Sequence, residues 1–194
     1  MPTLADYYRD LLIWEGVESR SLVDTWPEAL IVEVKNDFIQ SVARAQLKGS
    51  QCPLRDRSSN QSIGNQVEAF VVPQLTQNLS RHAISSCSGA GYPDQVLSSA
   101  SIRMPLEIKA TGDWNPRDSN RRVLTSSSTK LRDQFQSPIY HLLCTVLYSV
   151  QANGVRIDAL RLDFLEPSTA VSVRLEASVS HKLLSQAPHQ SVVI

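Results

Sequence analysis

The sequence predicts an α/β fold with a mixed central β-sheet and helices on its faces. Ile139 to Val150 is an almost continuous apolar run, as expected of a central strand that is buried on both faces. Leu106, Ile108 and Ala110 alternate with polar residues, as in a strand with one side towards the core. Apolar residues at helical spacing recur through the N-terminal third of the chain. Helices are therefore expected first, followed by strands.

The N-terminal part of the chain predicts three helices. An amphipathic helix over residues 4–12 would pack on the core or on a second subunit, with core packing the default. A second helical stripe runs from Glu28 to Ala45. The polar stretch from Lys48 to Ser62 is expected to be a loop. A third helix should begin near Gly64 and end or kink at Pro73, because proline has no backbone N–H.

The remaining strands are expected after this third helix. A stretch rich in Ser, Gly and Ala over residues 81–90 leads into a strand at Asp94. Asn153-Gly154 is a hairpin signal, and the last strand should span Val155 to Phe164. The Ser- and Val-rich tail carries no informative pattern.

Length and composition predict one soluble domain. A chain of 194 residues suffices for one well-buried domain, so we expect a single domain over 1–194 with a helical part over about 1–62. No run approaches the ~18 apolar residues needed to cross a bilayer, and charged residues interrupt the N-terminus where a secretory signal would be apolar. Three widely separated cysteines favour a reducing cytoplasm.

Three charged residues in the middle of the chain form the candidate catalytic site. Glu107 and Lys109 emerge on the same face if their segment is a strand. Asp94 lies thirteen positions before Glu107, which lets the preceding strand turn back and bring the two carboxylates together. Two carboxylates and one ammonium would then converge. The alternative is a strand whose charges are merely solvated.

Such a group suits the hydrolysis of a phosphodiester. Two carboxylates can hold Mg²⁺ while it keeps most of its waters. Bound Mg²⁺ lowers the pKa of a water and neutralises charge that develops on the phosphate. Lys109 could position the attacking water or help to deprotonate it.

The residues Pro93-Asp94 and Glu107-Ile108-Lys109 resemble the signature of the PD-(D/E)xK, or restriction-endonuclease-like, nuclease superfamily. The resemblance extends from the third helix to the last strand and is greatest to type II restriction endonucleases. It implies a restriction-endonuclease-like fold, with Asp94, Glu107 and the main-chain carbonyl of Ile108 as Mg²⁺ ligands. It also implies products with 5′-phosphate and 3′-hydroxyl ends.

Glu68 is a further candidate metal ligand. In the family that this chain resembles, an acidic residue on the helix before the catalytic strands often joins the metal cluster, and Glu68 has a matching place. The alternative is a solvated helix glutamate. A competing Glu-x-Lys match, Glu33 to Lys35 with Asp24 upstream, lies in a helical stripe, where the two side chains would point in different directions.

The polar segment from Thr111 to Lys130 is expected to lie on the same face as the site. Asn, Arg, Ser and Thr side chains bind base edges and phosphate oxygens, and type II restriction enzymes often read DNA from a segment in this position. The alternative is a serine-rich loop, and the Lys48 to Ser62 loop is a weaker candidate arm over DNA. The candidate DNA-binding residues are Asn115, Arg117, Arg121, Arg122, Ser126, Ser127, Ser128 and Lys130.

The charge of this segment, but not the net charge of the chain, supports the expectation that it binds DNA. The net charge is zero, but Ser101 to Arg132 contains seven basic residues and three acidic ones. Arginine outnumbers lysine fourteen to five, which favours bidentate contacts with phosphate or guanine. No paired-histidine or Cys-x-x-Cys zinc motif and no nucleotide-binding glycine motif occurs, so neither zinc nor a nucleotide cofactor is expected.

These patterns together predict a Mg²⁺-dependent endonuclease that cuts double-stranded DNA. A type II restriction enzyme acting as a homodimer is the first expectation, because two-fold DNA sites are naturally cut by two-fold proteins. A repair or recombination nuclease of the same fold, such as a junction resolvase, is one alternative. A catalytically inactive relative that only binds DNA or serves in an assembly is another.

Overall fold

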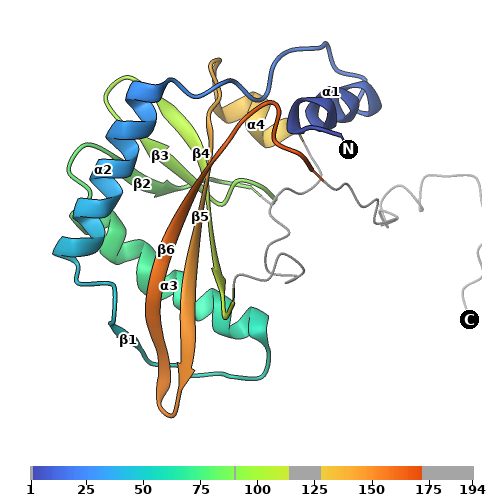
Figure 1. The fold of residues 1–194 in the computed structure, drawn as a ribbon. Helices are drawn as coiled ribbons and strands as arrows, with labels where there is room; N and C mark the ends of the chain where they lie inside the picture. The colour runs from blue at the N-terminus through green and yellow to red at the C-terminus, as the bar shows by residue number, and fades with distance from the viewer. Residues whose placement is uncertain (1, 90, 114–127, 172–194) are drawn as a thin grey trace, which may run out of the picture.

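The structure is a computed structural model that describes residues 2–89, 91–113 and 128–171. Helices and strands are interspersed along these residues, and the helices pack on a mixed sheet, so the class is α/β, as the sequence predicts (Figure 1). In chain order the elements are α1 (Leu4–Trp14), α2 (Glu28–Arg44), β1 (Gln51–Cys52), α3 (Asn60–Asn78), β2 (Ala83–Ser86), β3 (Gln95–Ser98), β4 (Arg103–Thr111), α4 (Thr129–Gln134), β5 (His141–Gln151) and β6 (Gly154–Leu165).

The strands form one mixed sheet. Across the described residues their order is β1-β6-β5-β4-β3-β2. β4 and β5 run parallel, whereas the other neighbouring pairs are antiparallel. β5 lies between two long strands, which confirms that the apolar run from Ile139 to Val150 forms a central strand. Gln151 pairs with Gly154, so the predicted hairpin joins β5 and β6 through a two-residue turn.

The first two helices form where the apolar stripes predict them. α1 begins with a capping box in which Thr3 and Asp6 satisfy each other's backbone N–H groups. Its stripe is buried on the core, with Leu4 and Leu12 at most 1% exposed. α2 likewise buries one side, including Val34. The expected core packing of the first helix and the expected helix over the second stripe are therefore confirmed.

The third helix is longer than the sequence predicts. α3 begins at Asn60, where the Ser59 hydroxyl accepts a hydrogen bond from the Ser62 N–H at 3.1 Å. It does not end at Pro73, as the sequence suggests it could, but continues to Asn78. A proline removes one helical hydrogen bond, and the buried side chains of Val71 and Leu75 hold the helix against the core on both sides of it.

The loop expected over residues 48–62 and the stretch over residues 81–90 also contain structure. The short strand β1 pairs with β6, and buried Cys52 lies opposite Val155. Gly154 permits this approach, because a Cβ atom at that position would lie 2.3 Å from the carbonyl oxygen of Cys52. β2 pairs with β3 over four residues. Neither edge strand has enough apolar residues to be recognised from the sequence.

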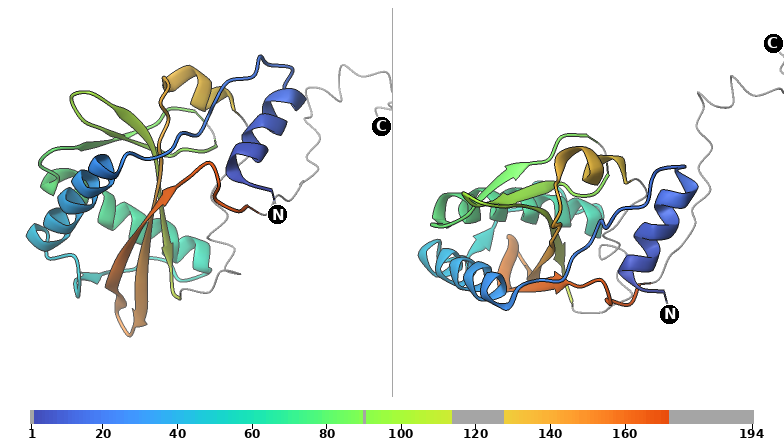
Figure 2. Two further views of the ribbon diagram at one scale, coloured as in Figure 1. Left: turned by 45° about the horizontal axis from the view of Figure 1, so that its top comes forward. Right: turned by 90° about the horizontal axis from the view of Figure 1, so that it is seen from above.

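Two apolar clusters cover the two faces of the sheet. One packs α2 and α3 against alternate residues of β4, among them Leu106 and Ile108. The other packs α1 and α4 around Val96, whose side chain points to the opposite face from that of Leu97. Figure 2 shows α1 at the far end of the molecule from α2. No helix in the described parts of the chain is long and apolar enough to span a membrane.

Candidate functional site

The pairing of β3 with β4 brings Asp94 beside Glu107. Gln95 is the first residue of β3 and lies opposite Leu106, so Asp94 comes next to Glu107 across the two strands. The backbone N–H of Asp94 donates to Glu107 Oε2 at 3.1 Å. Lys109 Nζ lies 2.8 Å from Glu107 Oε1 and 3.7 Å from Asp94 Oδ2. The fold thus brings together the three charged residues named from the sequence.

The site is more enclosed than the strand pattern suggests. β4 alternates as expected, and Leu106 and Ile108 are at most 1% exposed. However, Glu107 is only 4% exposed, and its carboxylate is contacted by the Asp94 N–H and the Lys109 ammonium. The side chain of Lys109 is 22% exposed and that of Asp94 is 51% exposed. The site therefore opens to solvent at Asp94 and closes at Glu107.

Burial and mutual attraction set the charge states of Glu107 and Lys109. Burial raises the pKa of Glu107, and the charge and hydrogen bond of Lys109 offset this rise only in part. Burial also lowers the pKa of Lys109, but the charge and hydrogen bond of Glu107, with further charges nearby, leave it above its ordinary value. Lys109 is therefore an ammonium at neutral pH. It can donate hydrogen bonds but cannot accept the proton of a water.

Glu68 on α3 belongs to the same electrostatic cluster. The pKa of Glu68 is raised to about 7, chiefly by burial and in part by the charges of Glu107 and Asp94, against the opposing effects of Lys109 and the Ala110 N–H. A solvated helix glutamate would not interact with these groups. Glu68 therefore adds a third carboxylate that interacts with the Lys109 ammonium.

The donor set suits Mg²⁺ in its chemistry. Within the described ranges, no three acidic, His or Cys side chains form a ready-made metal cage. Mg²⁺ often takes only one or two protein carboxylates and fills its other positions with water and phosphate. Asp94 and Glu107, joined by the hydrogen bond between them, provide such a pair.

Most of the candidate DNA-binding residues lie outside the described residues. They are Asn115, Arg117, Arg121, Arg122, Ser126 and Ser127.

Ser128 and Lys130, by contrast, are described, and both are held inside the protein. The Ser128 hydroxyl donates to Glu15 Oε2, and Ser128 is fully buried. Lys130 is 7% exposed and donates to the carbonyls of Gly89 and Gly91. The structure therefore does not present these two side chains to DNA.

Tyr92 and His141 support the site, although the sequence analysis did not single them out. His141 is fully buried, and its Nε2–H donates to the Leu22 carbonyl at 2.6 Å. Burial lowers the pKa of His141 to about 4, so the ring is neutral and its Nδ1 accepts a hydrogen bond from the Tyr92 hydroxyl at 2.7 Å. Tyr92 immediately precedes Pro93-Asp94, and a histidine that opens an apolar strand is the signal that could have drawn attention to this pair.

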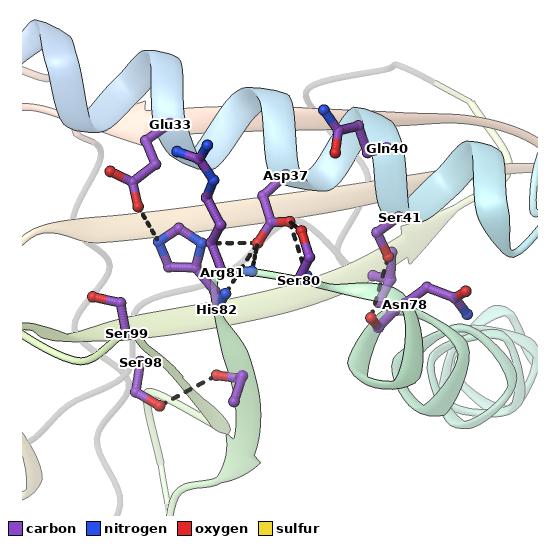
Figure 3. Close-up of polar contacts among 12 residues, drawn as sticks. Glu33, Asp37, Gln40, Ser41, Asn78, Ser80, Arg81, His82, Ser98 and Ser99 are labelled. Carbon is purple, nitrogen blue, oxygen red and sulfur yellow. Dashed lines mark hydrogen bonds and ion pairs between the residues drawn. The ribbon is translucent and has the colours of Figure 1, made fainter.

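A second polar cluster joins α2 to the start of β2 (Figure 3). Asp37 accepts hydrogen bonds from the backbone N–H groups of Ser80, Arg81 and His82 and from the His82 ring, whose Nδ1 lies at 3.0 Å. Glu33 lies 3.9 Å from His82 Nε2. The competing Glu-x-Lys match therefore lies on a helix, as expected, and Glu33 faces this junction.

Comparison with protein-family models and with curated proteins finds no match for this chain.

Proposed function

We propose that this protein is a Mg²⁺-dependent endonuclease of the PD-(D/E)xK type that hydrolyses phosphodiester bonds in double-stranded DNA. The observation that carries the proposal is the convergence of Asp94, Glu107 and Lys109 at the junction of β3 and β4. The parallel pairing of β4 with a buried central strand is consistent with a restriction-endonuclease-like arrangement. Glu68 adds a third carboxylate to the cluster.

In the proposed site, each residue has a distinct task. Asp94, Glu107 and the Ile108 carbonyl would hold Mg²⁺, which when bound supplies a more acidic water and positive charge next to the phosphate. Lys109, as an ammonium, would orient the attacking water through hydrogen bonds and stabilise the negative charge that develops on the phosphate oxygens. The sequence alone left two roles open for Lys109, to position the water or to deprotonate it. Because Lys109 is an ammonium, we propose the first role.

Glu68 is the carboxylate that can exchange a proton at neutral pH. Its pKa of about 7 leaves it partly ionised there, so it could take up the proton released by the water. Ionised Glu68 could also contribute to the metal cluster, as the family resemblance implies. In both roles the carboxylate is needed, and an amide in its place would impair the reaction.

A type II restriction enzyme acting as a homodimer is the specific form that we propose. Two active sites related by a two-fold axis would cut both strands of a symmetric DNA site. The products would carry 5′-phosphate and 3′-hydroxyl ends.

The proposal is tested by incubating the protein with supercoiled plasmid and genomic DNA in Mg²⁺ and sequencing the ends. Discrete cuts at one repeated sequence, absent from a preparation of Asp94→Asn made in parallel, are expected. Cleavage of branched substrates alone would instead favour a junction resolvase. Binding of DNA without cleavage in Mg²⁺ or Mn²⁺ would favour an inactive relative.

A further inference from the structure

Lys130 on α4 holds the loop that leads to Asp94. Its Nζ donates to the main-chain carbonyls of Gly89 and Gly91, each at 2.8 Å. We infer that Lys130 is a positioning residue for Asp94 and not a DNA contact. This inference rests on the proposed function, because it assigns Asp94 to the metal-binding pair.

The loop needs an additional contact to hold its conformation, because its glycines give the backbone unusual conformational freedom. Gly89 and Gly91 have φ values of +94° and +79°, in the left-handed region that glycine adopts most readily. Glycine also loses the most conformational freedom on ordering. An ammonium that bonds both carbonyls restricts this freedom, and such charge-assisted hydrogen bonds are stronger than neutral ones.

The helix that carries Lys130 is itself fixed in the core. Leu131 and Phe135 are at most 2% exposed and belong to the apolar cluster under α1. At the start of α4, the Ser128 N–H donates to Glu15 Oε1 at 3.0 Å, and Arg132 lies 3.7 Å from the same carboxylate. The ammonium of Lys130 therefore has a fixed position relative to the core. Its hydrogen bonds fix the position of the loop in turn.

The remaining contacts connect the loop to the site at both of its ends. Gln134 Nε2 donates to the Ser88 carbonyl at 2.9 Å, and the Cys87 N–H donates to the Asp94 carbonyl at 2.9 Å. Tyr92, the next residue after Gly91, is held by His141. A shift of the loop at Gly89 and Gly91 would consequently displace the segment that presents the Asp94 carboxylate.

Lys130→Met tests this role, because it keeps the length of the side chain and removes the ammonium. Residues that orient metal ligands typically contribute about 10–100-fold to metal affinity or activity. We expect a loss of that order in Ca²⁺ or Mn²⁺ affinity by calorimetry and a matching rise in the Mg²⁺ concentration for half-maximal cleavage. The affinity for DNA in saturating Ca²⁺, and its dependence on salt, should not change.

Two further variants sharpen the comparison. Lys35→Met removes the same charge from an exposed position on α2, and it should leave ion affinity unchanged. Lys130→Gln keeps a hydrogen-bond donor without the charge and should give an intermediate ion affinity. It also serves as the test if Lys130→Met does not fold.

Hydrogen exchange gives a readout that does not depend on activity. The amides of Cys87 and Asp94 donate to Asp94 O and Glu107 Oε2, respectively, so both report on the loop. They should exchange faster in Lys130→Met, while amides of the β4–β5 ladder exchange as in the parent protein. If the parent never cleaves DNA, faster exchange with weaker ion binding still supports the positioning role, although the proposed nuclease function would then fail.

Two results would overturn the inference. Ion affinity and exchange rates in Lys130→Met that match those in Lys35→Met would mean that the contact does not position Asp94. Weaker DNA binding with a salt slope lower by roughly one unit, at unchanged ion affinity, would mean that Lys130 contacts phosphate.

Discussion

The backbone N–H of Asp94 donates to Oε2 of Glu107, so the two proposed metal-binding residues are joined directly. The other oxygen of Glu107 accepts a hydrogen bond from Lys109. Both oxygens of this carboxylate are therefore engaged by donors. A cation at this position would share Glu107 with Lys109, and the charge of the lysine should oppose ion binding while it assists the reaction.

This relationship predicts different effects for substitutions at the three residues that we propose to be catalytic. Asp94→Asn and Glu107→Gln should reduce cleavage by at least about a hundredfold and also weaken divalent-ion binding, because each removes a ligand charge. Lys109→Met should reduce cleavage by a similar factor but bind Ca²⁺ at least as tightly as the parent. Single-turnover cleavage rates and calorimetric titration measure the two effects separately. A Lys109→Met protein that cuts at the parental rate would remove this residue from the mechanism.

Glu68 should destabilise the metal-free protein at alkaline pH. Its pKa is raised from 4.5 to about 7, so the folded state binds this proton more tightly than the unfolded state, and stability falls as the pH rises through that interval. Glu68→Gln should therefore be more stable than the parent at pH 8, by roughly 1–3 kcal/mol, and similar to it below pH 4. The same change should slow cleavage.

Urea unfolding at several pH values, with and without Mg²⁺, measures this difference. Glu28→Gln, an exposed position at the start of α2, is the control and should show no such pH dependence. If the Glu68→Gln protein is no more stable than the parent at pH 8 and cuts DNA normally, Glu68 is a solvated helix glutamate with no role in the site.

Asp37 should have the opposite effect on stability. Burial raises its pKa, but hydrogen bonds from the Ser80 backbone, the His82 ring and the Arg81 backbone together lower it from 3.8 to about 2. Its stabilising effect is therefore complete above pH 4 and is lost as the pH falls towards 2. Asp37→Asn should lower the free energy of unfolding at pH 7 by about 1–2 kcal/mol and flatten the acid limb of the stability curve. Asp10→Asn, at a half-exposed surface position, should leave that limb unchanged.

The arginines at positions 117, 121 and 122 are expected to hold DNA. If each neutralises a phosphate, replacement by Ala should weaken binding to all sequences alike and lower the salt slope by roughly one unit. If one reads a guanine, its loss should cost about 1–3 kcal/mol at a single base pair. Ser126 and Ser127 should affect specificity more than affinity. Affinities for cognate and scrambled duplexes in Ca²⁺ at several salt concentrations distinguish these cases, and unchanged binding throughout would direct attention to the Lys48 to Ser62 loop.

Local patterns predicted the elements whose signals lie within a few residues. Alternation at Leu106 and Ile108 identified β4, and the spacing of Asp94 from Glu107 anticipated that a strand turns back between them. What the sequence could not indicate depends on partners far along the chain. β1 becomes a strand because β6 lies beside it, and Glu107 interacts with Glu68 on α3, far earlier in the chain.

Lys130 illustrates the same limit within the site. Its neighbours in the sequence are polar and basic, which favoured a solvent-facing DNA contact. Its actual partners, Gly89 and Gly91, lie about forty positions earlier and offer only main-chain carbonyls, which leave no trace in the pattern of side chains. The position of a lysine relative to distant backbone oxygens follows from the packing of α4.

The parallel pairing of β4 and β5 has a consequence for how this protein could change over time. Parallel neighbours cannot be joined by a tight turn, so the chain must cross over between Thr111 and His141, and α4 lies within that crossover. A change in α4 would therefore act on the loop before Asp94 through Lys130, while the hydrogen-bonded ladder of β4 and β5 keeps Glu107 and Lys109 in register.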